Sequence, residues 1–180
     1  MQKYISLILF LWINSYQLYA NPWKPINVSV TFKIKHALGA TADGSFGGFT
    51  GVMIFDPDNL TTSSLKGSIE TKTINTGISL RDRTLRSGDY FDTEKYPKIT
   101  LQSTKIEKAQ QENEYIGYFS LTIKNITKNI RIPFTFVQNG AKATFRGNFM
   151  INRTEYGVGT KSSLLSDTAA IIIEIKTQQI

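Results

Sequence analysis

The chain has 180 residues, with 21 Lys and Arg against 14 Asp and Glu, a single His and no Cys. Its content of 41% hydrophobic and 19% charged residues is too apolar and too weakly charged for a disordered protein. The lack of Cys excludes disulfides, thiolate zinc sites and Cys nucleophiles, and a single His excludes a multi-histidine metal site. We therefore predict one globular domain without a metal or another cofactor.

Residues 1–20 are predicted to be a signal peptide. Lys3 precedes the apolar run Ile5–Ile13, and Ala20 is the small residue before the expected cleavage site. The run is too short to cross a hydrocarbon core of ~30 Å and is typical of a secretory signal; a buried N-terminal strand or helix is the alternative. We expect a periplasmic or secreted mature chain, 21–180, with no integral membrane segment and a formal charge of +6, since Lys3 is removed from the +7 of the whole.

Apolar and polar residues alternate along most of the mature chain, which is the pattern of β-strands with one buried face. In residues 26–36 every even position is apolar or His and every odd position is polar. Comparable patterns predict further strands over residues 45–55, 64–75, 99–105, 115–124, 128–138, 143–151 and 168–176. Asn139-Gly140 and the residues around Asn125 are predicted to be tight turns.

One segment, Ile78–Tyr90, is predicted to be helical. Eight antiparallel strands in one domain must close into a barrel or divide into a sandwich. A barrel of eight strands is just wide enough to hold one small elongated ligand. Alternation by itself does not distinguish a hollow barrel from one that its own side chains fill.

The basic residues are scattered one or two to a strand, which indicates a solvated outer face and no nucleic-acid site. The one dense group lies in Arg81–Arg86, where Arg83 and Arg86 share a face of the predicted helix. It is either a set of surface ion pairs or a cationic rim that holds a phosphate or carboxylate. His36 ends an apolar strand face; as a catalytic base it would need a nucleophile and a carboxylate that no motif supplies.

Six blocks of the sequence together carry a family resemblance. The longest block is Ile74–Asp92 (INTGISLRDRTLRSGDYFD). The others are Val30–His36 (VTFKIKH), Gly48–Asp56 (GFTGVMIFD), Tyr96–Ile99 (YPKI), Leu121–Lys128 (LTIKNITK) and Phe149–Gly157 (FMINRTEYG). In these residues and in their order the sequence resembles the YceI-like family of exported lipid-binding proteins over nearly the whole mature chain. One departure is Thr84, at a position where members often have His.

The resemblance implies an all-β fold: an eight-stranded antiparallel lipocalin-like barrel with a hydrophobic channel, capped by a short helix and often found as a homodimer. It also implies a polyisoprenoid, isoprenoid quinone or fatty-acyl ligand. The positions that it places at the channel mouth are Arg81, Asp82, Leu85, Arg86, Phe91 and Asp92, and the other positions of the family pattern are His36, Asn152, Arg153 and Tyr156.

We expect the channel lining to include Phe32, Phe119, Leu121, Phe134, Phe145 and Ile173, with Arg81 or Arg86 holding a polar head group. The hypothesis is a non-catalytic protein that carries or sequesters an isoprenoid-like or acyl lipid. The alternatives are an enzyme, a hydrolase or isomerase acting on a lipid-like substrate inside the barrel, and an interaction domain with a filled barrel.

Overall fold

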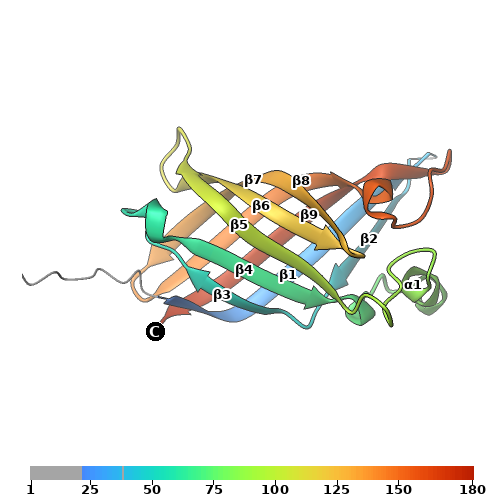
Figure 1. Ribbon diagram of the computed structural model, residues 1–180, viewed down its shortest axis with the longest axis horizontal. Helices are drawn as coiled ribbons and strands as arrows, with labels where there is room; N and C mark the ends of the chain where they lie inside the picture. The colour runs from blue at the N-terminus through green and yellow to red at the C-terminus, as the bar shows by residue number, and fades with distance from the viewer. Residues whose placement is uncertain (1–21, 38) are drawn as a thin grey trace, which may run out of the picture.

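The computed structural model describes residues 22–37 and 39–180, so the predicted signal peptide lies outside the described residues. These residues form an antiparallel β-barrel with a short helix and a long loop gathered at one end, while the C-terminus lies at the other end (Figure 1). The predicted fold class is thereby confirmed. No helix within the described ranges has the length and apolar character needed to cross a bilayer.

The elements follow the chain in the order that alternation predicts. The strands are β1 (Pro22–His36), β2 (Thr41–Phe46), β3 (Thr50–Ile54), β4 (Ser64–Glu70), β5 (Lys98–Lys108), β6 (Glu114–Ile123), β7 (Ile126–Asn139), β8 (Lys142–Asn152) and β9 (Leu165–Gln179). The helix is α1 (Ser79–Arg86), and the short 3-10 turns are η1 (Leu60–Thr62), η2 (Thr71–Thr73) and η3 (Arg153–Tyr156).

The barrel closes because β1 pairs with β9 along nearly its whole length. On its other edge β1 pairs first with β3, at Pro22 and Trp23, and further along with β2. Together β2 and β3 therefore fill one strand position of an eight-stranded barrel. The prediction of a single strand over residues 45–55 is wrong in this detail, because Gly47 and Gly48 interrupt it and Gly48 has a φ of +64°.

Two of the hairpin turns confirm the turn predictions. Only two residues separate β6 from β7, and these residues, Lys124 and Asn125, have φ angles of 47° and 66°. Positive φ at both central positions is the geometry of a type I′ hairpin turn, and Asn tolerates it. Gly140 provides a φ of 59° between β7 and β8.

The apolar face of β1 changes phase partway along the strand. The ladder with β9 has a register shift between Pro25 and Asn27. The buried side chain before the shift, Trp23, is at an odd position, and the buried one after it, Val30, is at an even position. Ile26 lies at the shift and is exposed, so the prediction that it shares the buried face of the even positions is wrong. The extra residue of a bulge moves the next side chain to the other face.

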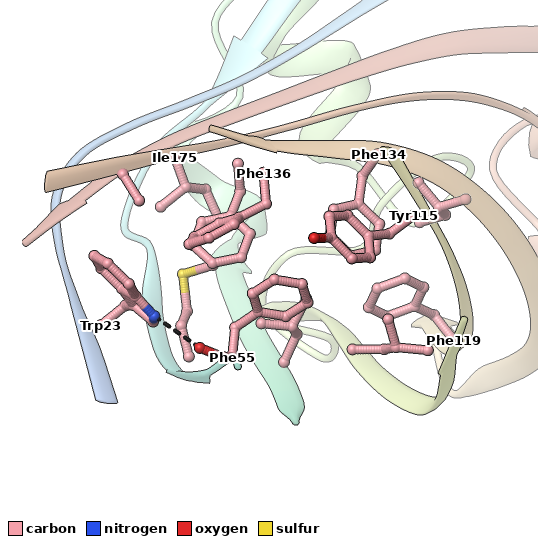
Figure 2. Packing of buried hydrophobic residues seen from close by; sticks show 13 residues of the cluster. Trp23, Phe55, Tyr115, Phe119, Phe134, Phe136 and Ile175 are labelled. Atoms are coloured by element: carbon pink, nitrogen blue, oxygen red, sulfur yellow. Dashed lines mark hydrogen bonds between the residues drawn. The ribbon is translucent and has the colours of Figure 1, made fainter. Parts of the chain in front are cut away.

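Aromatic residues fill the barrel at the end that holds the C-terminus. Phe55 lies at the centre, with ring centroids 4.7 Å from Phe136, 5.0 Å from Tyr115 and 5.4 Å from Phe145. The Trp23 ring meets Phe136 edge-on, and its Nε1 donates a buried hydrogen bond of 3.0 Å to the Phe55 carbonyl oxygen (Figure 2). This cluster closes one end of the barrel, so the site must open at the other.

Candidate functional site: an apolar cavity beneath α1

Between the aromatic cluster and α1 the barrel encloses a cavity of about 210 Å³. An apolar protein cavity of roughly 150 Å³ already accommodates benzene, so this space is large enough for a ligand. Its walls are mainly aliphatic and aromatic side chains from β1 to β9. Lys66, Arg146 and Arg153 also belong to the described lining, which includes neither a carboxylate nor a histidine. Such a space favours an apolar guest over water, which would find few hydrogen-bond partners there.

The burial pattern along β9 shows where the barrel is hollow. Its inward positions run Ala169, Ile171, Ile173 and Ile175, and all four line the cavity. Ala169 and Ile175 are buried, whereas Ile171 and Ile173 between them keep part of their surface free. The barrel is therefore filled at its closed end and hollow in its middle. Period-2 alternation cannot reveal this difference, because both regions place apolar residues inward.

Glycines in the strands make room for the phenylalanines of the wall. A Cβ atom added at Gly44 would lie 2.5 Å from Cζ of Phe32, and one at Gly67 would lie 2.7 Å from Cε2 of Phe49. A Cβ atom added at Gly51 would lie 2.6 Å from Cζ of the same Phe49 ring. Real Cβ atoms do not approach other atoms so closely, so these glycines allow the rings to lie flat against the sheet and leave the middle of the barrel open.

Side chains from α1 and the loop that follows it cover the mouth of the cavity. Leu85, Tyr90 and Phe91 all belong to the lining. The Phe91 ring meets Phe46 at 5.3 Å, and Phe46 in turn lies 5.5 Å from Phe32 on β1. The predicted mouth residues Leu85 and Phe91 thus reach the cavity, and a row of three aromatic rings joins the helix segment to the barrel wall.

The other predicted mouth residues hold the α1 segment together. Arg81 donates from Nε and Nη2 to the hydroxyl and carbonyl oxygens of Thr76, at 2.8 and 2.7 Å. Arg86 donates from Nε and Nη2 to the carbonyl oxygens of Lys72 and Ile74, both at 2.9 Å.

The two predicted mouth carboxylates, Asp82 and Asp92, do not line the cavity. The buried Asp82 accepts hydrogen bonds from the backbone N–H and the hydroxyl of Thr76. The carbonyl oxygen of Asp92 caps the following turn by accepting from the N–H groups of Lys95 and Tyr96. Thr84, the departure from the expected family pattern, is exposed, donates to the Leu80 carbonyl oxygen and does not line the cavity.

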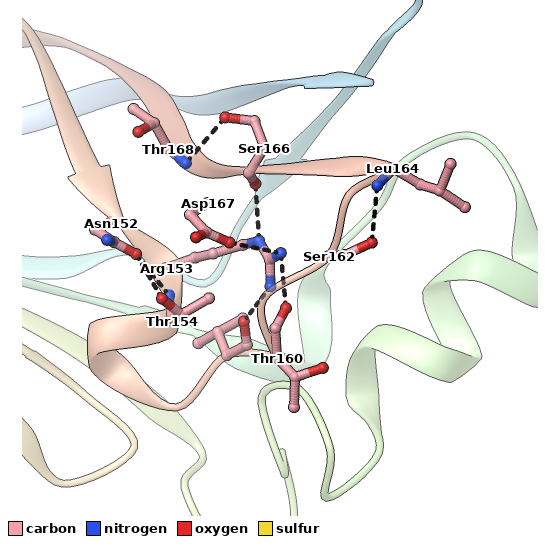
Figure 3. A network of polar contacts seen from close by, with 10 residues as sticks. Asn152, Arg153, Thr154, Thr160, Ser162, Leu164, Ser166, Asp167 and Thr168 are labelled. Atoms are coloured by element: carbon pink, nitrogen blue, oxygen red, sulfur yellow. Dashed lines mark hydrogen bonds and ion pairs between the residues drawn. The ribbon is translucent and has the colours of Figure 1, made fainter. Parts of the chain in front are cut away.

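Arg153 lines the cavity and also fastens the loop between η3 and β9 (Figure 3). Only 4% of its surface is exposed. Its guanidinium donates to the carbonyl oxygens of Val158 at 2.9 Å, Thr160 at 3.0 Å and Ser166 at 3.0 Å, and lies 3.4 Å from the Asp167 carboxylate. A single side chain thereby fixes the segment that forms one side of the mouth.

The remaining positions of the family pattern lie beside the cavity without lining it. His36 is exposed at the end of β1, where its N–H donates to the Ala40 carbonyl oxygen. Asn152 caps η3 by accepting from the Thr154 N–H. Tyr156 is buried against Leu121 and its neighbours, and burial raises the pKa of its phenol, whose oxygen finds no hydrogen-bond partner among the described residues.

All the side chains predicted to line the channel reach the cavity. Three of them, Phe119, Phe134 and Phe145, also belong to the aromatic cluster and form the cavity floor. Ile34 and Ile171 could have been added, because they share strand faces with predicted lining residues. Phe46 and Phe49 could not, because the glycine break between β2 and β3 disturbs the alternation that would have placed them.

Phe46 and Phe49 also border a gap in the barrel wall. A second hollow, of about 270 Å³, lies beside the edge of β1 that pairs with β3 and β2. Between those two pairings this edge has no ladder partner. It is lined by residues 25–28 on one side and 46–49 on the other. Because both phenylalanines line this hollow and the cavity, their rings form the partition between the two.

Comparison with known proteins places this barrel in a family, since the YceI-like domain matches residues 23–177. The chain belongs to the YceI-like family. It is 28% identical over 156 residues to the protein YceI of Escherichia coli O157:H7, covering 83% of this chain and 81% of that protein.

Two solved structures share the YceI-like barrel. Burkholderia cenocepacia BcnA superimposes with a TM-score of 0.78 at 27% identity, covering 83% of this chain and 95% of that one. A polyisoprenoid binding domain from Saccharophagus degradans, implicated in plant cell wall breakdown, superimposes with a TM-score of 0.70 over 90% of this chain and 99% of its own. At 14% identity the second likeness concerns the fold alone.

Proposed function

We propose that this YceI-like protein binds one elongated apolar lipid, an isoprenoid or acyl chain, in the barrel and carries or sequesters it without chemical change. The observation that carries the proposal is the apolar cavity between the aromatic cluster and α1. Each methylene group moved from water into such a space contributes about 0.8 kcal/mol. A tail of several methylene groups would offset the loss of freedom on binding.

The orientation of the ligand follows from the two ends of the cavity. Phe119, Phe134 and Phe145 close the floor with apolar rings, whereas the mouth lies next to solvent and to the polar atoms of the α1 segment. The apolar tail therefore points toward the floor and the head group lies at the mouth. A polyisoprenoid binding domain from Saccharophagus degradans has the same fold, which is compatible with a lipid in the barrel, and the leader-like residues 1–20 support export.

Native mass spectrometry of the protein purified from its own cells tests the proposal directly. We expect a co-purifying adduct of discrete mass that is released by organic solvent and identified as a lipid. Repeated absence of any adduct, together with failure to bind an apolar fluorescent probe such as N-phenyl-1-naphthylamine, would contradict lipid binding.

A matched pair of variants locates the ligand. Ile173→Trp places a larger side chain in the hollow middle of the barrel, whereas Ile172→Trp places the same side chain on the outer face of the same strand. We expect the first variant to lose probe binding and the adduct, and the second to keep both. Circular dichroism confirms that both variants are folded, and equal binding by both would place the ligand outside the cavity.

A further inference from the structure

Large aliphatic side chains are exposed around the mouth of the cavity. Ile78 and Leu80, at the start of α1, are 52% and 71% exposed, and Leu164, just before β9, is 65% exposed. The backbone carbonyl of Leu164 accepts a 3.0 Å hydrogen bond from Ala37 of the β1–β2 connection. Figure 1 shows α1, this connection and the loop before β9 at the same end of the barrel. We call Ile78, Leu80 and Leu164 the mouth aliphatics.

The side chains of α1 divide into those that face the cavity and those that face solvent. Leu85 faces the cavity and belongs to its lining. Leu80, Arg83 and Thr84 are exposed on the helix, and Leu80 and Arg83, three residues apart, are neighbours on its surface. The helix therefore presents an aliphatic group and a cation together to solvent, directly above the cavity that its other face covers.

Two exposed cations lie on the segments that carry the mouth aliphatics. Arg83 on α1 and Lys161, three residues before Leu164, are both exposed. The acid of the helix, Asp82, is buried and takes hydrogen bonds from Thr76, so its charge is turned inward. The loop after α1 adds two exposed carboxylates, Asp89 and Glu94, and one exposed cation, Lys95. Aliphatic groups beside cations are the combination that binds the interface of an anionic lipid bilayer.

We infer that the mouth end of the barrel docks on the surface of an anionic lipid bilayer, with the mouth aliphatics in the interface and Arg83 and Lys161 against lipid phosphates. The inference rests on the proposed function, because it supplies the route by which a water-insoluble chain reaches the cavity. In this orientation the tail passes from the bilayer to the mouth without crossing water.

A second copy of the chain fits this surface less well. Two copies meeting at their mouths would place four exposed cations, Arg83 and Lys161 of each copy, in one interface. Like charges brought together at an interface are costly, whereas lipid phosphates neutralise them. The charge of the surface therefore favours a bilayer over a homodimer as its partner.

Vesicle co-sedimentation tests the docking. The probes are vesicles of phosphatidylcholine alone and of equimolar phosphatidylcholine and phosphatidylglycerol. We expect the protein to bind the anionic vesicles more tightly, and less tightly as salt is added. Arg83→Gln with Lys161→Gln should weaken that binding about 25-fold, at about fivefold for each cation. Leu80→Ser with Leu164→Ser should weaken binding to both kinds of vesicle.

Val137→Ser is the matched control, because Val137 is 53% exposed near the closed end of the barrel, beside the β7–β8 turn. All variants are made from the full sequence and their N-termini checked by intact mass, so any effect of residues 1–20 is common to them. Equal vesicle binding by the parent and the mouth variants, or equal loss in the control, would overturn the docking. So would conversion of a dimer to a monomer by the leucine changes.

Binding of N-phenyl-1-naphthylamine without vesicles separates this inference from the proposed function. A protein that binds the probe and shows no preference for anionic vesicles has a working cavity and no docking surface of this kind. A protein that binds anionic vesicles through the mouth aliphatics but takes up no probe has the surface without the proposed function. The mouth variants should bind the probe as the parent does, because none of the changed residues lines the cavity.

Discussion

Replacing Arg153 by Leu tests whether one buried side chain fixes the mouth loop. The change removes the donors to Val158, Thr160 and Ser166 and leaves three carbonyl oxygens without them. A buried hydrogen bond to a charged group contributes about 1.5–3 kcal/mol. The hydrogen bond to Val158 is buried, whereas those to Thr160 and Ser166 are part-buried. In the variant, water can therefore donate to the Thr160 and Ser166 carbonyl oxygens and reduce the loss of stability. We expect the free energy of unfolding to fall by about 3 kcal/mol.

Urea and thermal unfolding followed by circular dichroism measure this loss. For a domain of this size about 3 kcal/mol lowers the melting temperature by about 10 °C. Amide hydrogen exchange should rise most between η3 and β9, because the loop loses its anchor while the barrel ladders remain. The control is Arg131→Leu, which removes an exposed arginine from the outer face of β7 and should change stability by less than about 0.5 kcal/mol. If both variants lost the same stability, the anchoring role of Arg153 would be refuted.

Three further predictions concern the wall, the buried phenol and the α1 segment. Gly67→Ala should cost about 1–3 kcal/mol, because its Cβ would meet the Phe49 ring, and the cost should shrink in a Phe49→Ala background in a double-mutant cycle. Tyr156→Phe should stabilise the protein by about 1 kcal/mol at neutral pH, since it removes an unpartnered hydroxyl. Burial raises the Tyr156 pKa, so above pH ~10 the unfolded chain releases the phenol proton before the folded chain does. The parent should therefore lose stability relative to Tyr156→Phe as the pH rises above ~10, with a constant difference below it, and unfolding free energies of both proteins at increasing pH measure this. Arg81→Ala with Arg86→Ala should weaken binding of phosphate-headed lipids and quinones equally, because both guanidiniums hold backbone carbonyls; a selective loss for phosphate would assign them to the head group.

The strands could be predicted because their signal is local. A strand with one buried face shows its period in adjacent residues, and β6 keeps this period throughout. The turns at Asn125 and Gly140 were equally readable, since positive φ restricts the residue type. The inward faces of the strands could be predicted from the same alternation, and Phe32, Leu121 and Ile173, which it assigned to the lining, lie in the cavity wall.

The site residues on irregular segments needed the folded chain. Arg81 and Arg86 carry the same sequence signal whether a guanidinium faces a ligand or a backbone carbonyl. Their actual acceptors, the carbonyl oxygens of residues 72–76, are defined by the path of the loop before α1. In the same way the acceptors of Arg153 lie five to thirteen residues further along the chain, in a loop without a periodic pattern.

From the sequence alone came the class of the molecule: one cysteine-free domain of alternating strands, with the apolar content directed inward. The tertiary structure decided where the inward-facing apolar side chains pack against one another and where they leave a cavity. Trp23 and Phe55 come together only when β1 and β3 pair, and their contact closes one end of the barrel. The hollow middle has the same alternation as the filled end, because a period specifies the direction of a side chain and not what stands opposite it.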